Sequence, residues 1–190
     1  VKRAKQRLNE AGLQNIPQLG NELRILRHLR HPNIVATHGA IVEPAEQQLS
    51  LILEFVEGVT LTEFMLSGAQ MKRNSLLPRF QVMVGVCRAL LYMHTRRPRV
   101  VHGDLKSGNI MVQVSGHSAS PKLLDFGLSR VLTRHARRLG GTLAWTAPEV
   151  LRGRPAKCSS DVYSFGHVVA LLATGNLPEQ RVTNAMSFRH

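Results

Sequence analysis

With 190 residues, of which 43% are hydrophobic, the chain has the size and apolar content of one globular domain. Its net charge of +13 would suit an acidic partner, but the basic residues form short, scattered groups without the interleaved aromatic side chains that stack on bases, so nucleic-acid binding is not expected. No run reaches the roughly eighteen apolar residues of a membrane span, and the first residues, VKRAKQRLNE, lack the apolar segment of a secretion signal, so membrane insertion is not expected either.

The first predicted helix covers residues 19–29 and ends before Pro32. Its apolar positions recur at helical spacing: Leu19, Leu23, Leu26 and Leu29. Glu22 leans toward this apolar face, where a carboxylate needs a cation. Two strands with a turn between them are predicted next, in IVATHGAIV at 34–42 and LSLILEFV at 49–56.

After Gly58 the pattern becomes helical, over residues 61–66 and again over 77–94. The longer helix has one apolar stripe, which consists of Phe80, Val84, Cys87 and Leu91. Short strands are predicted at 99–101 and 109–114, and the GHSAS stretch at 116–120 reads as a turn.

Residues 129–148 show no lasting periodicity, and a long irregular loop inside a compact domain is usually functional or mobile. The following segment, SSDVYSFGHVVALLATG, predicts a helix that is apolar almost all round and therefore central in the domain. Ser159, Ser160 or Asp161 is expected to cap its start, and Gly175 to end it.

Polar side chains stand at the edges of the predicted strands: Asp104, Asn109 and Asp125. Asn109 directly precedes one strand and Asp125 closely follows another, so both could project from the ends of a small hairpin toward Asp104. Oxygen ligands of this kind suit a hard cation such as Mg²⁺, and Lys106 could neutralise charge on a transferred phosphoryl group. Any one of these residues alone would be read as a turn cap, but the set favours phosphoryl-transfer chemistry.

The motifs HGDLKSGN, DFG and WTAPE, in that order, resemble the catalytic core of eukaryotic protein kinases. The resemblance implies an α+β, two-lobed protein-kinase-like fold that is incomplete in this chain. Residues 1–57 would form a partial ATP-binding lobe, rich in β-structure and with one helix, and residues 58–190 a partial helical catalytic lobe that ends after the central apolar helix.

The resemblance also assigns catalytic roles to the polar residues. Asp104 would orient the substrate hydroxyl and accept its proton, and Lys106 would contact the γ-phosphate of ATP. Asn109 and Asp125 would hold the metal ions, Mg²⁺, on ATP.

On the ATP-binding side, Glu22 matches the carboxylate that pairs with the ATP-binding lysine, and Lys2 stands at the distance where that lysine is expected. The alternative for Lys2 is a solvated lysine at the chain terminus. The strand and hinge that receive adenine are matched by Leu53 in the gatekeeper place, by the backbone of Glu54 and Val56 as hydrogen-bonding groups, and by Met111 beneath the ring.

Further residues match supporting parts of the kinase fold. His102, Phe126 and Leu26 would belong to its internal apolar stack, and Asp161 would accept hydrogen bonds from the catalytic-loop backbone. Glu149 belongs to the APE motif, whose usual partner is an arginine far downstream, and Thr142 would bridge Asp104 and Lys106.

The chain departs from the family pattern at its ends and at Gly103. It starts after the expected glycine-rich loop and stops soon after the central helix, so we expect a piece of a longer protein with weak ATP binding and little activity. Many kinases have arginine at position 103, where it pairs with a phosphate on the activation loop. We therefore expect that phosphorylation of Ser129, Thr133 or Thr142 is not the main switch.

The resemblance thus predicts a serine/threonine protein kinase of the tyrosine-kinase-like group, which transfers the γ-phosphoryl group of ATP to a protein hydroxyl. ATP and Mg²⁺ would be its cofactors, and proteins with serine or threonine hydroxyls, together with regulatory proteins, its partners. Cys87 and Cys158 lie far apart in no ligand-like spacing, which argues against disulfides or zinc and favours a cytoplasmic location, free or as the cytosolic part of a longer protein.

Two other classes of function stay open. A pseudokinase or scaffold would fit the missing loop and Gly103, but it does not explain why the base, the lysine and both metal ligands are all present. A nucleic-acid-binding role depends on net charge alone.

Overall fold

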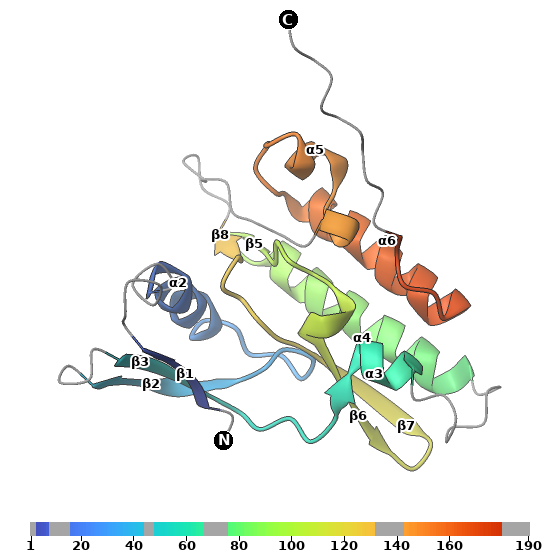
Figure 1. Cartoon of the computed structure of the whole chain (residues 1–190), viewed down its shortest axis with the longest axis horizontal. Coiled ribbons are helices and arrows are strands. Elements are labelled where there is room, and N and C mark those ends of the chain that lie inside the picture. Colours follow the sequence, from blue (N-terminus) through green and yellow to red (C-terminus); the bar gives the residue numbers. More distant parts are fainter. Residues whose placement is uncertain (1–2, 8–15, 44–47, 67–75, 132–142, 180–190) are drawn as a thin grey trace, which may run out of the picture.

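The computed structural model describes residues 3–7, 16–43, 48–66, 76–131 and 143–179, which form a small β-rich region with one helix and a larger region built mainly of helices (Figure 1). The two regions are joined through the segment after β3 (Gln48–Leu53). The predicted α+β architecture is confirmed. The proposed boundary between residues 57 and 58 stays a prediction.

The small region contains a three-stranded antiparallel sheet in the order β1-β3-β2, made of β1 (Arg3–Arg7), β3 and β2 (Thr37–Glu43). Both predicted strands are present, but β2 begins at Thr37 and β3 ends at Leu53. The first residues of one predicted strand and the last of the other therefore form loops. Helix α2 (Ile16–Leu26) packs against β2 and β3.

Helix α2 lies about three residues earlier than the periodicity predicted. It ends at Leu26, where the amides of His28 and Leu29 donate to the carbonyls of Ile25 and Leu26, at 3.1 and 3.0 Å. Such bonds to the third residue back tighten the chain into turns. Leu29 is still buried, with 2% of its surface exposed, so the leucine pattern predicted burial correctly but extended the helix too far.

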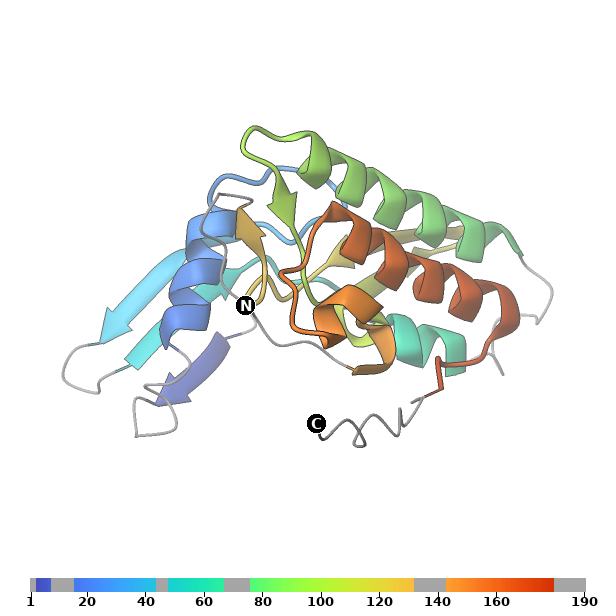
Figure 2. The same cartoon turned by 90° about the horizontal axis from the view of Figure 1, so that it is seen from above.

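Helices α4 (Leu76–Thr95) and α6 (Cys158–Thr174) dominate the larger region and lie side by side in antiparallel directions (Figure 2). The shorter helices of this region are α3 (Leu61–Leu66), η2 (Ser107–Asn109), η3 (Leu143–Trp145) and α5 (Pro148–Leu151). The predicted helices at 61–66 and 77–94 are thus confirmed.

A second three-stranded sheet has the order β4-β6-β7, with β4 (Val59–Thr60), β6 (Ile110–Ser115) and β7 (Ser118–Leu123). Its β6–β7 hairpin turns at Gly116 and His117 only, so residues 118–120 of the predicted turn belong to a strand. The third sheet pairs β5 (Val100–Val101) with β8 (Arg130–Val131).

The apolar stripe that was predicted to be the buried face of α4 is not the buried face. Phe80 and Leu91 are 57% and 62% exposed. The buried positions lie on the opposite side, at Pro78, Val82, Gly85, Val86, Ala89, Leu90 and Met93. Because α4 carries apolar residues on both sides, its neighbours β7 and α6 decide which side is buried. Gly85 fits this contact, since a Cβ there would lie 2.4 Å from Cγ of Pro121.

Helix α6 ends as its sequence indicated but begins earlier, at Cys158, with Lys157 as its N-cap, so the prediction that Ser159, Ser160 or Asp161 is the N-cap was wrong. Ser160 still contributes to the cap from the third helical position, because its Oγ accepts the amide proton of Lys157 at 3.0 Å. Gly175 ends the helix with φ +79°. Val162 and Tyr163 are 58% and 43% exposed, so within the described residues α6 is covered on one face only.

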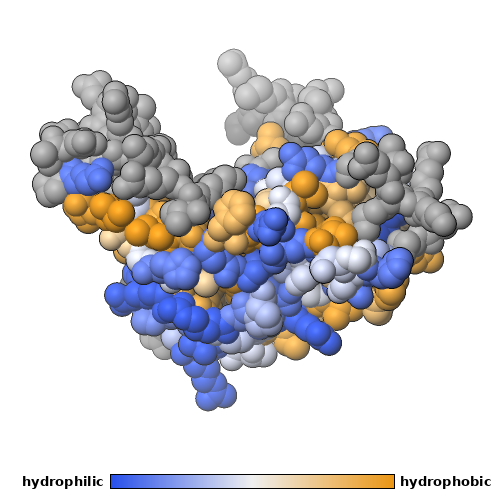
Figure 3. All heavy atoms as spheres, turned by 90° about the horizontal axis from the view of Figure 1, so that it is seen from below, coloured by the Kyte–Doolittle hydropathy of each residue, from blue (hydrophilic) through white to orange (hydrophobic). Residues whose placement is uncertain are grey.

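A single hydrophobic cluster runs through both regions. It includes Leu26 at the end of α2, Leu29 in the turn after it, Leu123 of β7 and Leu171 of α6. On the face shown in Figure 3, hydrophilic residues cover the lower left, and hydrophobic residues are exposed among them over the rest of the coloured surface. Because the core is shared, the small region is held directly against the large one.

Helix α4 has the length and mean hydropathy of a membrane-crossing helix, with 39% of that window buried. Core helices of globular proteins pass the same test, and α4 packs on β7 and α6. The expectation that this segment does not insert into a membrane stays a prediction.

Candidate active site

The catalytic-loop motif folds as predicted, as an irregular segment between β5 and β6. Asp104 is 8% exposed, and its Oδ2 lies 2.7 Å from Nζ of Lys106. The side-chain amide of Asn109 donates to Asp104 twice, to the carbonyl oxygen at 2.9 Å and to Oδ2 at 3.1 Å. One carboxylate oxygen therefore joins an ammonium and an amide, and fixes all three groups relative to one another.

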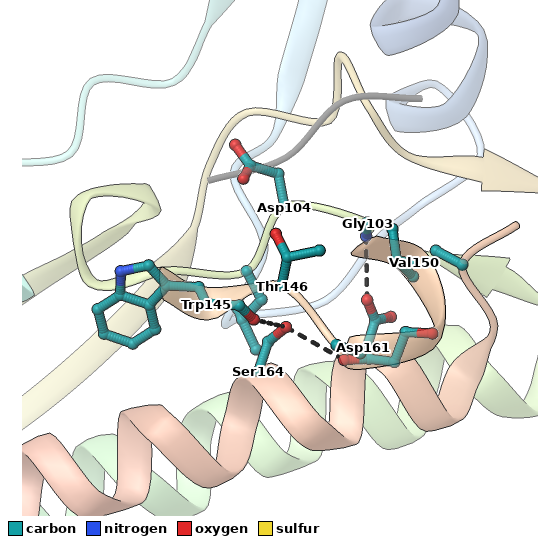
Figure 4. Close-up of a pocket in the computed structure, with 11 residues that line it drawn as sticks. Gly103, Asp104, Trp145, Thr146, Val150, Asp161 and Ser164 are labelled. Atoms are coloured by element: carbon teal, nitrogen blue, oxygen red, sulfur yellow. Dashed lines mark hydrogen bonds between the residues drawn. The ribbon is translucent and has the colours of Figure 1, made fainter. Parts of the chain in front are cut away.

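Helix α6 holds this loop through Asp161, which is 1% exposed. Its Oδ2 accepts the amide proton of His102 at 2.8 Å and its Oδ1 that of Gly103 at 3.0 Å, as Figure 4 shows for Gly103. Nε2 of His94 lies 2.8 Å from the same carboxylate. The expectation that Asp161 binds the loop backbone is confirmed, and a buried carboxylate with three such partners is well stabilised.

His102 is fully buried and connects the loop to the core. Its Nε2 lies 3.1 Å from the carbonyl oxygen of Leu124, which can only accept, and its Nδ1 faces the amide of Asp104 at 3.3 Å, which can only donate. These two contacts fit the tautomer that carries a proton on Nε2. Its centroid is 4.9 Å from that of Phe126, and Leu26 and Phe126 are each 0% exposed, as expected of an internal apolar stack.

Gly103 has a backbone reason to be glycine. Its φ is +82°, and a Cβ at this position would lie 2.7 Å from the carbonyl oxygen of Leu128. Any other residue would be strained in this conformation. The sequence showed only that arginine is missing from this position, because a backbone angle cannot be read from the motif.

The β6–β7 hairpin brings the two predicted metal ligands to one end of the sheet. Asn109 precedes β6 and Asp125 follows β7, and the amide of Leu124 donates to the carbonyl of Asn109 at 2.9 Å. Asp125 is exposed, with φ +58°, and its Oδ1 accepts the amide proton of Gly127 at 3.3 Å.

The donor set at this end of the hairpin fits Mg²⁺. Because Nδ2 of Asn109 is engaged by Asp104, its Oδ1 remains as an oxygen donor beside the exposed carboxylate of Asp125. Mg²⁺ prefers one or two such protein oxygens and completes its shell with water and phosphate. Among the described residues, no group of three His, Cys, Asp or Glu side chains could hold a metal by itself.

Glu22 lies on α2 with 9% of its surface exposed. Burial raises the pKa of this carboxyl group to about 7. The amide of Phe126, which donates to Oε1 at 3.3 Å, lowers the pKa, whereas the negative charge of Asp125 raises it further. The carboxylate therefore needs a cation, as the sequence predicted. Its predicted partner, Lys2, lies outside the described residues.

The four predicted adenine-site residues lie at the junction of the two regions. Leu53 ends β3 and Met111 lies in β6, and both are half-buried against the core. The backbone amide of Glu54 already donates to the carbonyl of Ala36 at 2.9 Å. Of the two backbone groups of Glu54, the carbonyl is therefore the one left for a ligand. Val56 is 9% exposed.

Asn21 is a site residue that the sequence did not reveal. Its side-chain amide donates to the carbonyl oxygens of Gly127 at 3.1 Å and Ser129 at 2.5 Å. It thereby ties α2 to the segment that follows Asp125. No local pattern could have identified it, because its partners are 106 and 108 residues away in the chain.

Ser129, one of the hydroxyl residues considered for phosphorylation, is 0% exposed. Its Oγ donates to the carbonyl of His102 at 2.8 Å. A phosphoryl group cannot reach it without opening the loop, which supports the prediction that this residue is not the main switch. Thr133 and Thr142 lie outside the described residues.

A small recess lies beside Asp104, with Trp145, Thr146 and Ala147 forming one side (Figure 4). Oγ of Ser164 donates to the carbonyl of Trp145 at 2.8 Å, which anchors this segment to α6. Glu149, which follows, accepts a hydrogen bond from Ser160 at 2.7 Å, and this bond lowers the pKa of its carboxyl group.

A buried carboxylate bonded to an ammonium and an amide, beside two oxygen donors and between a β-rich and a helical region, defines a phosphotransferase type of site. A family model described as the protein kinase domain matches residues 1–190, and the chain belongs to the protein kinase family.

Three relatives illustrate the similarity. The serine/threonine-protein kinase CTR1 of Arabidopsis thaliana is 34% identical over 184 residues, which are 93% of this chain and 22% of that protein. The probable serine/threonine-protein kinase SIS8 of the same plant is 35% identical, over 92% of this chain and 17% of that protein. The U-box domain-containing protein 70 of Oryza sativa subsp. japonica is 34% identical, over 90% and 22%.

The predicted kinase fold is thus confirmed, and CTR1 and SIS8 are named as serine/threonine-protein kinases, the type that the sequence predicted. The chain spans about a fifth of the length of these relatives. ATP as phosphoryl donor, usually with a divalent metal, follows from membership of the family.

Proposed function

We propose that the chain is the phosphoryl-transferring part of a serine/threonine protein kinase, which moves the γ-phosphoryl group of ATP to a protein hydroxyl. The observation that carries this proposal is the arrangement of Asp104, Lys106 and Asn109, joined at 2.7 and 3.1 Å through one carboxylate oxygen. A pseudokinase has no physical need for this set of base, cation and metal ligand.

In this mechanism Asp104 orients the substrate hydroxyl, and its carboxylate accepts the proton as the oxygen attacks the γ-phosphorus, whose bond to the bridging oxygen of the β-phosphate breaks and releases ADP. Lys106 places its positive charge against the γ-phosphoryl oxygens, where negative charge is spread in the transition state. Oδ1 of Asn109 and the carboxylate of Asp125 would hold Mg²⁺, which when bound would neutralise charge on the phosphates. Asn109 thus has two tasks, since its other amide group fixes Asp104.

On the nucleotide side, we assign Lys2 and Glu22 to the ion pair that positions the ATP phosphates. Leu53 borders the adenine, and Met111 packs beneath it. The carbonyl of Glu54 and the backbone of Val56 supply its hydrogen bonds.

The ATP-binding part is assigned to residues 1–57 and the catalytic part to residues 58–190. Two lobes of this kind leave the nucleotide between them, at the junction where the adenine-site residues lie.

The substrate hydroxyl, on a serine or threonine of a protein, is assigned to the position facing the carboxylate of Asp104. We place this domain in the cytoplasm, where the unpaired thiols of Cys87 and Cys158 stay reduced. Some relatives are named receptor-like kinases, so the domain could equally be the cytosolic part of a longer protein.

Calorimetric titration of the protein with ATP, with and without Mg²⁺, tests the nucleotide site. We expect Mg²⁺ to tighten ATP binding in the wild type, and Asp125→Asn to remove about tenfold of affinity in Mg²⁺ only, because one charged metal ligand is lost. The variant Asp104→Asn should keep its ATP affinity within about twofold, since the base touches the hydroxyl rather than ATP. Equal ATP affinity of wild type and Asp125→Asn in Mg²⁺ would refute the assignment of the metal site.

A further inference from the structure

A cleft of about 400 Å³ lies on α2 and on the segment between α4 and β5, and none of the residues assigned to phosphoryl transfer lines it. Its lining residues are Arg24, Ile25, Arg27, His28, Leu29, Arg96, Arg97, Pro98 and Val100. The two walls are held together by the amide of Arg30, which donates to Oη of Tyr92 at 3.1 Å. The proposed function assigns nothing to this cleft.

Four arginines line the cleft, and all are exposed: Arg24, Arg27, Arg96 and Arg97. The contacts that hold them are with neutral acceptors. Arg24 donates to Oδ1 of Asn21 at 3.0 Å and Arg27 to Nε2 of His28 at 2.8 Å. No carboxylate lines the cleft, and within the described residues none of the four arginines forms a salt bridge. The cleft therefore carries positive charge that these residues do not compensate.

The remainder of the lining is apolar. Ile25 and Leu29 are 2% exposed and Val100 is 7% exposed, so they form a firm floor that belongs to the core. A recessed apolar floor with a cationic rim favours a ligand that has an acidic group and some apolar surface. A free inorganic ion would use the rim only.

We propose that this cleft binds an acidic segment of a partner protein, one that presents carboxylate or phosphoryl groups beside apolar side chains. The planar guanidinium group matches both oxyanions in bidentate geometry, and its charge is strongest where a cleft limits solvent. The lining contains no Phe, Tyr or Trp on which a base could stack, so a peptide fits this surface better than single-stranded nucleic acid.

A second copy of these 190 residues fits the cleft less well than an acidic partner does. The 190 residues contain only 12 acidic residues, spread along the sequence, and the net charge of +13 makes two copies repel each other. The occupant that complements this charge is an acidic segment of a partner with the opposite charge balance. Such a partner would contact α2, the helix that also carries Asn21 and Glu22.

Fluorescence anisotropy with labelled peptides of about ten residues tests the proposal. One peptide is rich in glutamate and leucine, a second has glutamine in place of glutamate, and a third has phosphoserine at two of the acidic positions. We expect the two anionic peptides to bind and the glutamine peptide to bind at least about tenfold more weakly, and binding should weaken as salt is added.

The variant Arg27→Glu with Arg97→Glu should weaken binding of the acidic peptides by about tenfold or more. The matched control is Arg88→Glu with Arg154→Glu, which makes the same change in net charge at exposed positions outside the cleft and should change affinity by less than about twofold. If the first pair prevents folding, Arg24→Gln with Arg96→Gln replaces it.

Three results would overturn the proposal. Equal losses in the two charge-reversed variants would show binding by net charge alone. Full competition by inorganic phosphate at the concentration of the peptide would indicate a site for a free ion. Stronger binding of an oligothymidine, lost in the variant with Arg27→Glu and Arg97→Glu, would assign the cleft to nucleic acid.

Discussion

At the scale of single residues, the catalytic loop combines chemistry that the sequence displays with geometry that it does not. Asp104, Lys106 and Asn109 were predicted as one functional set, because few structures need a carboxylate, an ammonium and an amide so close together, and their side chains do make contact. The conformation of Gly103 was not predictable, because its positive φ depends on the carbonyl of Leu128 on another segment. Its glycine therefore supports the loop geometry, whatever its consequence for regulation.

Glu22 provides a pH-dependent test at this scale. Burial raises its pKa from the usual 4.5 to about 7, so the folded state binds this proton more tightly than the unfolded state does. Its contribution to stability is therefore fully present below pH 4.5 and is lost as the pH rises to about 7, by about 3 kcal/mol at most. Urea unfolding at pH 5 and pH 8 should show a smaller loss for Glu22→Gln than for the wild type.

Lys2→Met extends this test to the proposed ion pair. An ammonium near Glu22 opposes the rise in pKa, so the variant should lose more stability than the wild type between pH 5 and pH 8. Glu179→Gln, at an exposed carboxylate, is the control and should follow the wild type. A Glu22→Gln variant with the same pH dependence as the wild type would contradict the account of this carboxylate.

At the scale of elements, periodicity predicted which segments are helices and strands better than it predicted how they pack. The long helix was found, but its buried face was wrong, because α4 is apolar on several sides and only its contacts with β7 and α6 decide the matter. Helix α2 was predicted too far along the chain, because the buried Leu29 lies in the turn after the helix and not in the helix itself. The spacing of buried residues thus continues into the turns that follow a helix, so it does not mark where the helix ends.

The tie between α2 and residues 127–129 is the element-scale contact that matters most for the site. Asn21→Asp keeps the shape of the side chain but sets a carboxylate against two carbonyl oxygens that now receive hydrogen bonds at 3.1 and 2.5 Å. We expect a loss of about 1–3 kcal/mol in unfolding free energy, and faster amide exchange in α2 and at Phe126, whose amide Glu22 holds.

Arg24→Ala is the matched control for this tie. It removes the hydrogen bond to Oδ1 of Asn21 at 3.0 Å but leaves the donors of Asn21 in place, so amide exchange in α2 should change little. Unchanged exchange in both variants would mean that Asn21 does not couple α2 to the loop.

At the scale of the whole molecule, one continuous hydrophobic cluster connects the nucleotide side to the catalytic side. The order of the motifs was enough to predict this architecture, because each motif lies on a loop between elements that the fold sets side by side. The long-range contacts that fix the loops were only partly predictable. Asp161 was expected from the motif pattern, whereas the contacts of Asn21 and the cationic cleft depend on segments that are distant in sequence.

The same scale separates the three classes of function considered from the sequence. A scaffold would keep the shared core and the cleft without needing Asp104 and Asn109 to be joined. A nucleic-acid-binding protein would need neither. Only phosphoryl transfer uses the whole set of contacts around Asp104 and the two oxygen donors at the end of the hairpin.

The most direct measurement is the transfer of labelled γ-phosphate from ATP to a protein substrate rich in serine and threonine, by the full-length protein that carries this domain. We predict incorporation that requires Mg²⁺ and that falls by about a thousandfold or more in Asp104→Asn and in Asp125→Asn, with each variant folded as the wild type is. The control Glu179→Gln should retain full activity. Equal incorporation by the wild type and both variants, or none by any of them, would contradict the assignment of phosphoryl transfer to this site.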